Sequence, residues 1–275
     1  MPEGDTVARL ARTLGAQLNG KVLHATDFRV PAHATADLSD WVISDVVARG
    51  KHLLIRTVAP DGVRHLSLHS HLRMDGSWRL FPRAGVARAT RRRQFPGADV
   101  RVVLTTAESY AVARAVTEVR LIPTADEGRM LNHLGPDPLG DDWDAAIAVD
   151  RMKAASTELL STALLDQRIM TGVGNVFRCE VLFLAGVNPW RLVADVPLIA
   201  DVVDCAARLL QENASRRWRV TTEDDRRGRE LWVYGRARQP CRRCGNAVRS
   251  GTVGSGAPDA HDAPRLIYWC ATCQQ

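Results

Sequence analysis

The sequence contains no run of about eighteen apolar residues, the length that a membrane-spanning helix needs. Its N-terminus also lacks the basic stretch followed by an apolar stretch that is typical of a secretory signal. These absences argue against an integral membrane protein and against an exported one. We therefore expect a soluble chain in the cytoplasm.

Lysine is scarce, since Lys21, Lys51 and Lys153 are the only lysines. Arginine therefore supplies most of the net charge of +6 and the isoelectric point near 9.3. Guanidinium groups suit phosphate oxygens, so this charge is compatible with a nucleic-acid partner. High-GC coding bias also replaces lysine by arginine, so the positions of the arginines are more informative than their number.

The six cysteines do not form the pattern of a disulfide framework. Four of them form two Cys-x-x-Cys pairs, Cys241 with Cys244 and Cys270 with Cys273, while Cys179 and Cys205 lie in helical patterns. Two such pairs offer four thiolates to one tetrahedral ion, and Gly245 allows a tight turn after the first pair. We expect one structural Zn²⁺ here, because so small a terminal unit has too little apolar material to fold alone.

A chain of 275 residues with 45% apolar content has the length of about two domains. The spacing of Val7, Leu10, Leu14 and Leu18 predicts a helix over 6–18. Short apolar or alternating runs follow and are typical of a β-sandwich or barrel. The runs are 21–24, 41–43, 52–56, 66–69 and 100–104, and the arginine-rich stretch 81–98 between them is interpreted as a basic loop, solvated rather than in contact with DNA.

The stretch 135–140, with Pro136, Pro138 and Gly140, predicts a domain boundary. Helical spacing follows over 142–153, 156–166, 175–185 and 197–214, with Pro197 at a first helical position. The charged run 215–230 is expected to be exposed and flexible. A last small unit starts near Leu231, and its residues 248–249 and 265–269 are expected to form a hairpin with Arg265 near the turn.

The first residues, Met1-Pro2-Glu3-Gly4, offer chemistry once Met1 is removed. The secondary amine of Pro2 can then add to an aldehyde carbon and lose water, which leaves an iminium ion that acts as an electron sink. The carboxylate of Glu3 can move protons beside that nitrogen. Many chains begin with Met-Pro without such a role, so this hypothesis depends on the rest of the sequence.

Two further stretches leave alternatives open, and for a third the functional readings are rejected. The glycine-bearing turn in 165–176, before a helix start at Asn175, predicts either a phosphate site or an ordinary helical hairpin. Lys51 is either a solvated charge or a functional amine. His69-Ser70-His71 lacks a third metal ligand at suitable spacing and a strand-turn-helix elbow, so neither a metal pair nor a catalytic triad is expected.

Taken in order, these motifs resemble the formamidopyrimidine-DNA glycosylase and endonuclease VIII family, and the resemblance spans the chain. It rests on Pro2-Glu3-Gly4, Gly50-Lys51-His52-Leu53-Leu54, His71-Leu72-Arg73-Met74-Asp75-Gly76, Leu134-Gly135-Pro136-Asp137-Pro138-Leu139, Gly172-Val173-Gly174-Asn175, Tyr234-Gly235-Arg236 and the stretch from Arg265 to Gln274.

The resemblance implies an α+β protein with three parts. These are an N-terminal catalytic β-sandwich with a leading helix (1–125), a helix–two-turn–helix DNA-binding domain (135–230) and a zinc finger (231–275). It further implies a bifunctional DNA glycosylase and AP lyase of base excision repair, both hydrolase and lyase, that needs no redox cofactor. The expected partner is damaged DNA, double-stranded or also single-stranded, bound by a monomer at the nucleoid.

The resemblance also implies roles for residues. Pro2 would attack the sugar C1′, Glu3 would assist ring opening, and Lys51 would contact a phosphate and donate a proton in β-elimination. Asn175 and Arg265 would grip the phosphates beside the extruded nucleotide, with Arg265 also serving δ-elimination. Met74, with Arg73 beside it, would fill the hole that the flipped base leaves.

The chain departs from the family pattern in two places. Asp5-Thr6 stands where the family commonly has Pro-Glu, so a second family carboxylate is replaced by Thr6. The arginine-arginine-phenylalanine loop of the 8-oxoguanine branch is missing between Tyr110 and Pro123. We therefore expect the endonuclease VIII side and oxidised pyrimidines; the alternatives are an 8-oxoguanine or formamidopyrimidine glycosylase and a catalytically weak protein that binds damaged or single-stranded DNA.

Overall fold

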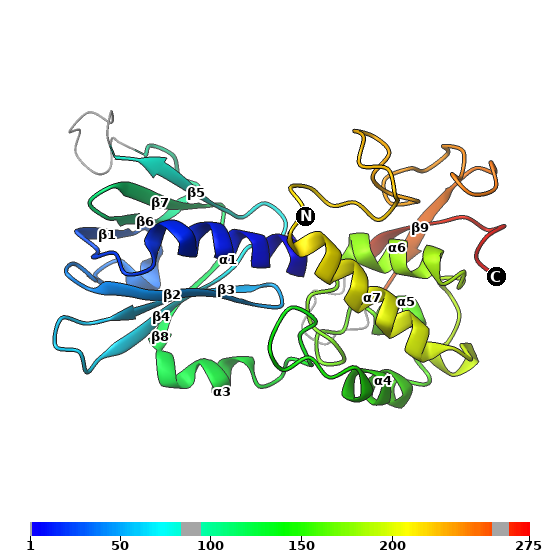
Figure 1. Cartoon of the computed structure of the whole chain (residues 1–275), viewed down its shortest axis with the longest axis horizontal. Helices are drawn as coiled ribbons and strands as arrows, with labels where there is room; N and C mark the ends of the chain where they lie inside the picture. The colour runs from blue at the N-terminus through cyan, green and yellow to red at the C-terminus, as the bar shows by residue number, and fades with distance from the viewer. Residues whose placement is uncertain (1, 84–94, 255–263) are drawn as a thin grey trace. The chain divides into compact units, whose positions relative to one another are not determined.

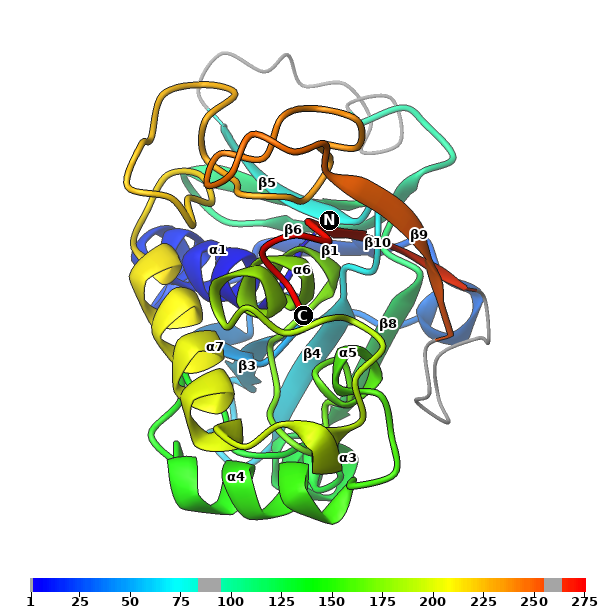
Figure 2. The same cartoon turned by 90° about the vertical axis from the view of Figure 1, so that its right-hand side faces the viewer.

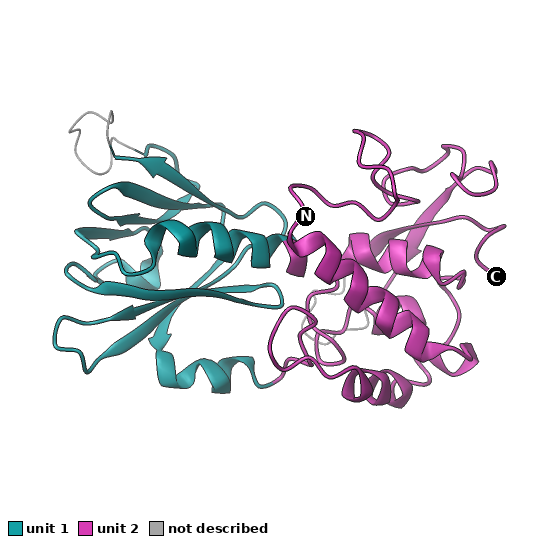
Figure 3. Ribbon diagram, viewed as in Figure 1, with its two compact units in different colours: residues 1–2, 6–132 teal, residues 3–5, 133–275 magenta. Residues whose placement is uncertain are grey.

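The computed structural model describes residues 2–83, 95–254 and 264–275. The chain divides into two compact units (Figures 1 and 3). The first unit is Met1–Pro2 with Thr6–Asn132, and the second is Glu3–Asp5 with His133–Gln275. Residues 3–5 therefore pack with the second unit, although the helix that begins there belongs mostly to the first.

The first unit is a sandwich of two antiparallel four-stranded sheets (Figure 1). Its leading helix is α1, Gly4–Leu18. One sheet has the order β1-β6-β7-β5 and the other β2-β3-β4-β8. The strands are β1 (Ala25–Phe28), β2 (Val42–Arg49), β3 (His52–Val58), β4 (His65–His71), β5 (Ser77–Pro82), β6 (Val100–Thr105), β7 (Ser109–Arg114) and β8 (Glu118–Pro123); the short helices are η1 (Pro31–His33), η2 (Thr124–Asp126) and α3 (Glu127–Leu131).

The core of this unit lies between the two sheets and under α1. Val7, Leu14 and Leu18 of the helix pack with side chains from both sheets, among them Leu53 and Leu104. The predicted helix is confirmed, with Leu10 only partly buried. The strand expected over 21–24 is wrong, because that stretch makes one isolated bridge, Val22 to Val42, before β1 begins at Ala25.

The second unit packs helices against a two-stranded hairpin (Figure 2). The helices are α4 (Ala145–Ala154), α5 (Leu160–Ala163), α6 (Asn175–Leu184), η3 (Val193–Asp195) and α7 (Ile199–Ala214), and the hairpin is β9 (Arg249–Val253) with β10 (Arg265–Trp269). Phe177, Phe183, Leu210 and Ile267 are fully buried in the core that joins them.

Two predicted helices differ from the observed ones. The helix expected over 156–166 shrinks to α5, because Leu159 bridges Leu192 and the Leu160 N–H donates to the Arg191 carbonyl instead of continuing a helical ladder. Pro197 is not at a first helical position, since α7 begins at Ile199.

The fold class predicted from the sequence is confirmed: a leading helix and β-sandwich are followed by a helical part and a cysteine cluster. The division into 1–125, 135–230 and 231–275 stays a prediction. Within the described residues, no helix has the length and apolar character needed to cross a bilayer. Most of the predicted basic loop, residues 84–94, lies outside the described residues.

Candidate functional site

Glu3 is a fully buried carboxylate at the start of α6. It accepts backbone hydrogen bonds from Gly174 at 3.0 Å, Val176 at 2.7 Å and Phe177 at 3.2 Å. The first N–H groups of a helix have no partner within the helix and carry the positive end of its dipole, so they favour an anion. Helix α6 thus fixes the residue that follows Pro2, which is itself half-buried.

Two glycines, Gly4 and Gly174, allow the N-terminal segment to lie close to the turn before α6. A Cβ on Gly174 would lie 2.4 Å from Glu3 Cδ, and a Cβ on Gly4 would lie 2.9 Å from the Gly172 Cα. The Gly4 N–H donates to the Gly172 carbonyl at 2.9 Å. The glycine-bearing turn that the sequence singles out therefore holds the N-terminal segment of this chain.

Asn175 and the hairpin of β9 and β10 are joined by hydrogen bonds. Asn175 Nδ2 donates to the Leu266 carbonyl at 2.8 Å, next to Arg265, and Asn175 Oδ1 accepts from Arg178 Nη2. Arg178 Nη2 also donates to the Leu266 carbonyl at 3.2 Å. Asn175 and the backbone beside Arg265 are therefore brought together, and the Asn175 amide is held in one orientation.

Arg178 is a site residue that the sequence did not suggest. Its side chain is fully buried, and its Nε and Nη1 have no hydrogen-bond partner within the described residues. Burial, with Arg265 acting in the same direction, lowers the pKa of Arg178. The only available sign was that Arg178 and Glu180 interrupt the mainly apolar run 176–184, since charged residues are seldom fully buried unless paired.

Glu180, also fully buried, anchors the segment that follows the charged run. It accepts N–H groups from Trp232, Val233 and Tyr234 at 2.7–2.9 Å, and the Thr221 hydroxyl donates to it as well. The expectation that 215–230 is simply exposed is wrong for 219–221. Val220 and Thr221 are buried there, and the Arg219 side chain is 13% exposed because it pairs with Asp5.

The four predicted metal ligands form one cluster. The Sγ atoms of Cys241, Cys244, Cys270 and Cys273 all lie within 4.8 Å of one another, with Cys241 to Cys273 at 3.9 Å and Cys244 to Cys270 at 3.4 Å. Four sulfurs about 2.3 Å from one tetrahedral ion lie about 3.8 Å apart. The cluster thus has the donor set and the spacing of a four-thiolate metal centre.

In the first unit, Lys51, Arg73 and Met74 lie on turns at one end of a sheet. Lys51 follows Gly50, whose φ of +54° suits the two-residue turn between β2 and β3. His52 pairs with His71 across the sheet, which brings the Lys51 turn to the end of β4, where Arg73 and Met74 follow. The Met74 side chain is 62% exposed.

Histidines line the strands below these turns. His52 Nδ1 lies 2.8 Å from His69 Nε2, and the His52 and His71 ring centroids lie 4.9 Å apart. The Arg73 N–H donates to His71 Nδ1 at 3.1 Å. Burial, reinforced by Arg73 and Lys51, lowers the pKa of His71 to about 3, so this ring is neutral at physiological pH.

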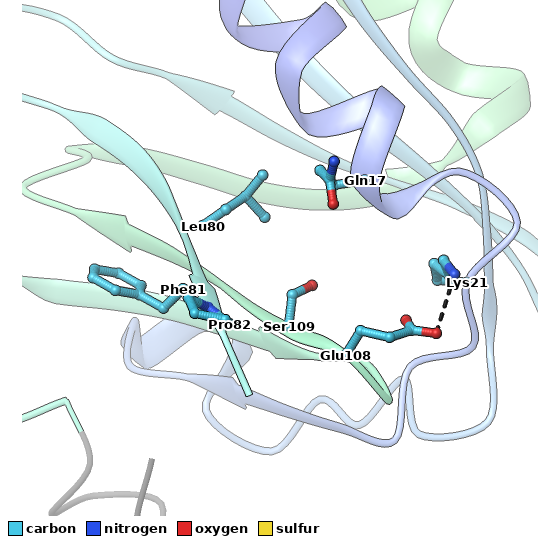
Figure 4. Close-up of a pocket in the computed structure, with 7 residues that line it drawn as sticks. All are labelled: Gln17, Lys21, Leu80, Phe81, Pro82, Glu108 and Ser109. Carbon is cyan, nitrogen blue, oxygen red and sulfur yellow. Dashed lines mark hydrogen bonds and ion pairs between the residues drawn. The ribbon is translucent and has the colours of Figure 1, made fainter. Parts of the chain in front are cut away.

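The first unit also has a small hollow of about 290 Å³ (Figure 4). The exposed pair Lys21 and Glu108, 3.1 Å apart, closes one side of it. None of the predicted site residues lines it; the lining residues are Gln17, Lys21, Leu80, Phe81, Pro82, Glu108 and Ser109.

Comparison with known proteins identifies the family. The family model described as the formamidopyrimidine-DNA glycosylase N-terminal domain matches residues 1–126, and the one described as its H2TH domain matches 134–215. The chain belongs to the formamidopyrimidine-DNA glycosylase family. The resemblance stated from the sequence is thereby confirmed.

Within this family, the chain is similar to proteins named for endonuclease 8. It is 45% identical to the probable endonuclease 8 2 of Streptomyces coelicolor, over 100% of this chain and 94% of the relative. It is 41% identical to the DNA-(apurinic or apyrimidinic site) lyase Nei2 of Mycolicibacterium smegmatis, over 100% of this chain and 99% of the relative. A formamidopyrimidine-DNA glycosylase of Stenotrophomonas maltophilia is 29% identical to it, over 100% of this chain and 99% of the relative.

Solved structures show the same fold. A MutM structure in complex with DNA containing carbocyclic 8-oxo-G has a TM-score of 0.80, with 23% identity and full coverage of both chains. The Lactococcus lactis formamidopyrimidine-DNA glycosylase bound to DNA containing an AP site has a TM-score of 0.78, with 22% identity over 99% of each chain.

Proposed function

We propose that this protein is a bifunctional DNA glycosylase and AP lyase of base excision repair in which Pro2 is the nucleophile. The enzyme class follows from the family and from the endonuclease 8 and lyase relatives. The observation that supports the role of the N-terminal segment is the fixed position of Glu3, whose buried carboxylate binds the start of α6.

The proposed reaction begins once Met1 has been removed. The Pro2 nitrogen attacks the sugar C1′, the bond from C1′ to the base breaks, and the base leaves with a proton. Opening of the sugar ring then places the proline nitrogen in an iminium ion, with the ring oxygen protonated. Glu3, the adjacent carboxylate, is the group that moves protons in this step.

Strand cleavage follows from the charge of the iminium ion. The cation acidifies the C2′ hydrogen, so removal of that proton expels the 3′-phosphate by β-elimination. A second elimination breaks the C5′ to oxygen bond and releases the 5′-phosphate, and water then frees the proline. We assign Lys51 to a phosphate contact and proton donation in the first elimination, and Arg265 to the second.

Contacts with the DNA backbone would hold the damaged nucleotide outside the DNA double helix. Asn175 and Arg265, joined through the Leu266 carbonyl, suit two phosphates on either side of that nucleotide. Met74 is the exposed apolar side chain that would fill the vacated stack, with Arg73 beside it. Extrusion of a base costs a few kcal/mol, and these contacts must supply it.

The cysteine cluster fits a single Zn²⁺ bound by Cys241, Cys244, Cys270 and Cys273. Four thiolates leave no open position on a tetrahedral ion, so we assign the metal to the structure of the finger. The finger carries the Leu266 carbonyl that accepts from both Asn175 and Arg178. The metal would thereby keep Asn175 and Arg265 in position to contact the phosphates.

Oxidised pyrimidines are the proposed lesions, supported by the higher identity to endonuclease 8 relatives than to the formamidopyrimidine-DNA glycosylases. Damaged duplex DNA is the proposed substrate, with single-stranded DNA as a further one. A monomer located with the nucleoid in the cytoplasm stays a prediction from the sequence.

Borohydride trapping on DNA with one abasic site tests the nucleophile. The protein with a free Pro2 should form a covalent adduct and nick the strand. In a variant with one extra glycine before Pro2, the proline nitrogen is part of an amide. Adduct formation and strand nicking should both fall at least about 100-fold, because an amide nitrogen is not nucleophilic.

Lysine variants are the matched controls, since a lysine amine is the rival nucleophile. Lys21→Gln and Lys153→Gln should trap as the unmodified protein does. Full trapping by the glycine-extended variant would show that the proline nitrogen is not required for the adduct. Absence of any adduct with the unmodified protein would indicate a protein that binds DNA without turnover. Excision of thymine glycol in preference to 8-oxoguanine from matched duplexes is the expected lesion order.

A further inference from the structure

Arg219 differs from the other arginines of the segment 215–230. Its side chain is 13% exposed, whereas those of Arg226 and Arg229 are 72% and 58% exposed. The neighbouring Val220 N–H donates at 2.6 Å to Asn213, a fully buried side chain at the end of α7. The backbone beside Arg219 is therefore anchored.

The Arg219 guanidinium contacts both acidic residues that follow Pro2. Its Nη2 and Nε donate to the two Asp5 carboxylate oxygens at 2.5 and 3.1 Å, and its Nη1 lies 3.7 Å from Glu3 Oε1. The guanidinium also stacks over the Phe177 ring, 4.5 Å from the centroid. Phe177 is the residue whose N–H donates to Glu3.

Two fully buried carboxylates, Glu3 and Asp5, thus share one cation. Without it, two like charges would repel each other away from water, which is costly. Burial opposes the charge on Arg219, but Glu3 and Asp5 outweigh this and raise the pKa of the guanidinium. The Arg219 guanidinium therefore stays charged at physiological pH.

We propose that Arg219 is a positioning residue that acts through Glu3: with Asp5 it holds the Glu3 carboxylate against the start of α6 and balances its charge during proton transfer at Pro2. The inference rests on the proposed function of Pro2 and Glu3. It assigns a role to an arginine in a segment whose composition suggests only a solvated loop.

The effect on pH dependence has a definite sign. Loss of a cation 3.7 Å from Glu3 makes that carboxylate easier to protonate, so the acidic limb of the pH–rate profile moves to higher pH. Other charged or titratable groups remain around Glu3 in the variant and limit the shift. They are Asp5 on α1, Arg178 and Cys179 on α6, and Tyr234.

The test measures single-turnover nicking of DNA with one abasic site against pH. For Arg219→Gln we expect a rate lower by on the order of tenfold, a fraction of what an acid–base group contributes, and an acidic limb at higher pH. Binding to DNA with a tetrahydrofuran abasic analogue should change by less than about twofold. Arg219→Lys, which keeps the charge without the planar fork, should restore the limb and part of the rate.

Arg64→Gln is the matched control. Arg64 also pairs with an aspartate, Asp61, at 2.9 Å and stacks over an aromatic ring, that of Trp41, but its side chain is 67% exposed. It should keep the profile of the unmodified protein. A folded Arg219→Gln with an unchanged profile overturns the inference; if that variant does not fold, a rate for Arg219→Lys equal to that of the unmodified protein overturns it.

The two proposals fail differently. If the unmodified protein gives no borohydride adduct with abasic-site DNA, the proposed function is wrong. If the unmodified protein traps and nicks while Arg219 variants behave identically, only the positioning role is wrong.

Discussion

Replacing Gly174 by alanine should expel the Glu3 carboxylate from the start of α6. Gly174 has a φ of −124° and a ψ of −163°, an extended conformation that alanine adopts without strain. The new methyl group, however, would lie 2.4 Å from Glu3 Cδ and 2.5 Å from Cγ. Because the glycine backbone cannot move without disturbing the first turn of α6, Glu3 must leave.

The cost can be worked from the lost contacts. Three N–H groups lose a charged acceptor, and each such bond contributes about 1.5–3 kcal/mol, with values that do not add fully. The alanine stabilises the folded state by about 0.4–1 kcal/mol, because it lowers the conformational entropy of the unfolded chain. We expect the free energy of unfolding to fall by about 3 kcal/mol and the nicking rate on abasic-site DNA by at least about 100-fold.

Urea unfolding and single-turnover nicking measure the two effects. Gly128→Ala is the control, since Gly128 lies in α3 with open space around its Cβ position and should become equally or slightly more stable. If Gly174→Ala unfolds at the same urea concentration as the unmodified protein and nicks at the same rate, the account of Glu3 as the anion bound by α6 is refuted.

Two further predictions concern the metal and pH. For the proposed zinc centre, Cys244→Ser or treatment with a chelator should abolish the zinc signal in a metal assay. Either should also lower the thermal midpoint and weaken binding to abasic-analogue DNA at least tenfold, because the Leu266 carbonyl then loses its support. Stability should fall with acidification from about pH 6.5 towards 3, by up to about 1.4 kcal/mol per pH unit, because the unfolded His71 binds a proton that the folded one, with its pKa lowered to about 3, does not. His71→Asn should flatten that slope in urea titrations, whereas replacement of the exposed His65 should not. Unchanged stability after removal of the metal would contradict the argument on the cysteine cluster. An unchanged slope in His71→Asn would contradict the argument on His71.

Much of the fold could be predicted because its causes are local. The helix over 6–18, the strands near 52–56 and 100–104, and the hairpin around Arg265 follow from apolar periodicity, which acts over a few residues. The four cysteines are recognisable because two residues between thiols fix a spacing that suits one ion. The predictions failed where a segment farther along the chain competed, as when Leu159 and Leu160 bonded to residues 192 and 191 instead of extending α5.

The sequence by itself determined the family, the sandwich with its helical partner and the identity of the candidate nucleophile, since each depends on short ordered motifs. The tertiary structure alone decided the environment of that nucleophile. Glu3 finds its N–H donors at 174–177 and Arg219 finds Asp5, partners that are more than 170 positions away in the chain. No local pattern encodes such pairings, because an arginine in a run of charges has the same neighbours in sequence whether water or a buried carboxylate satisfies it.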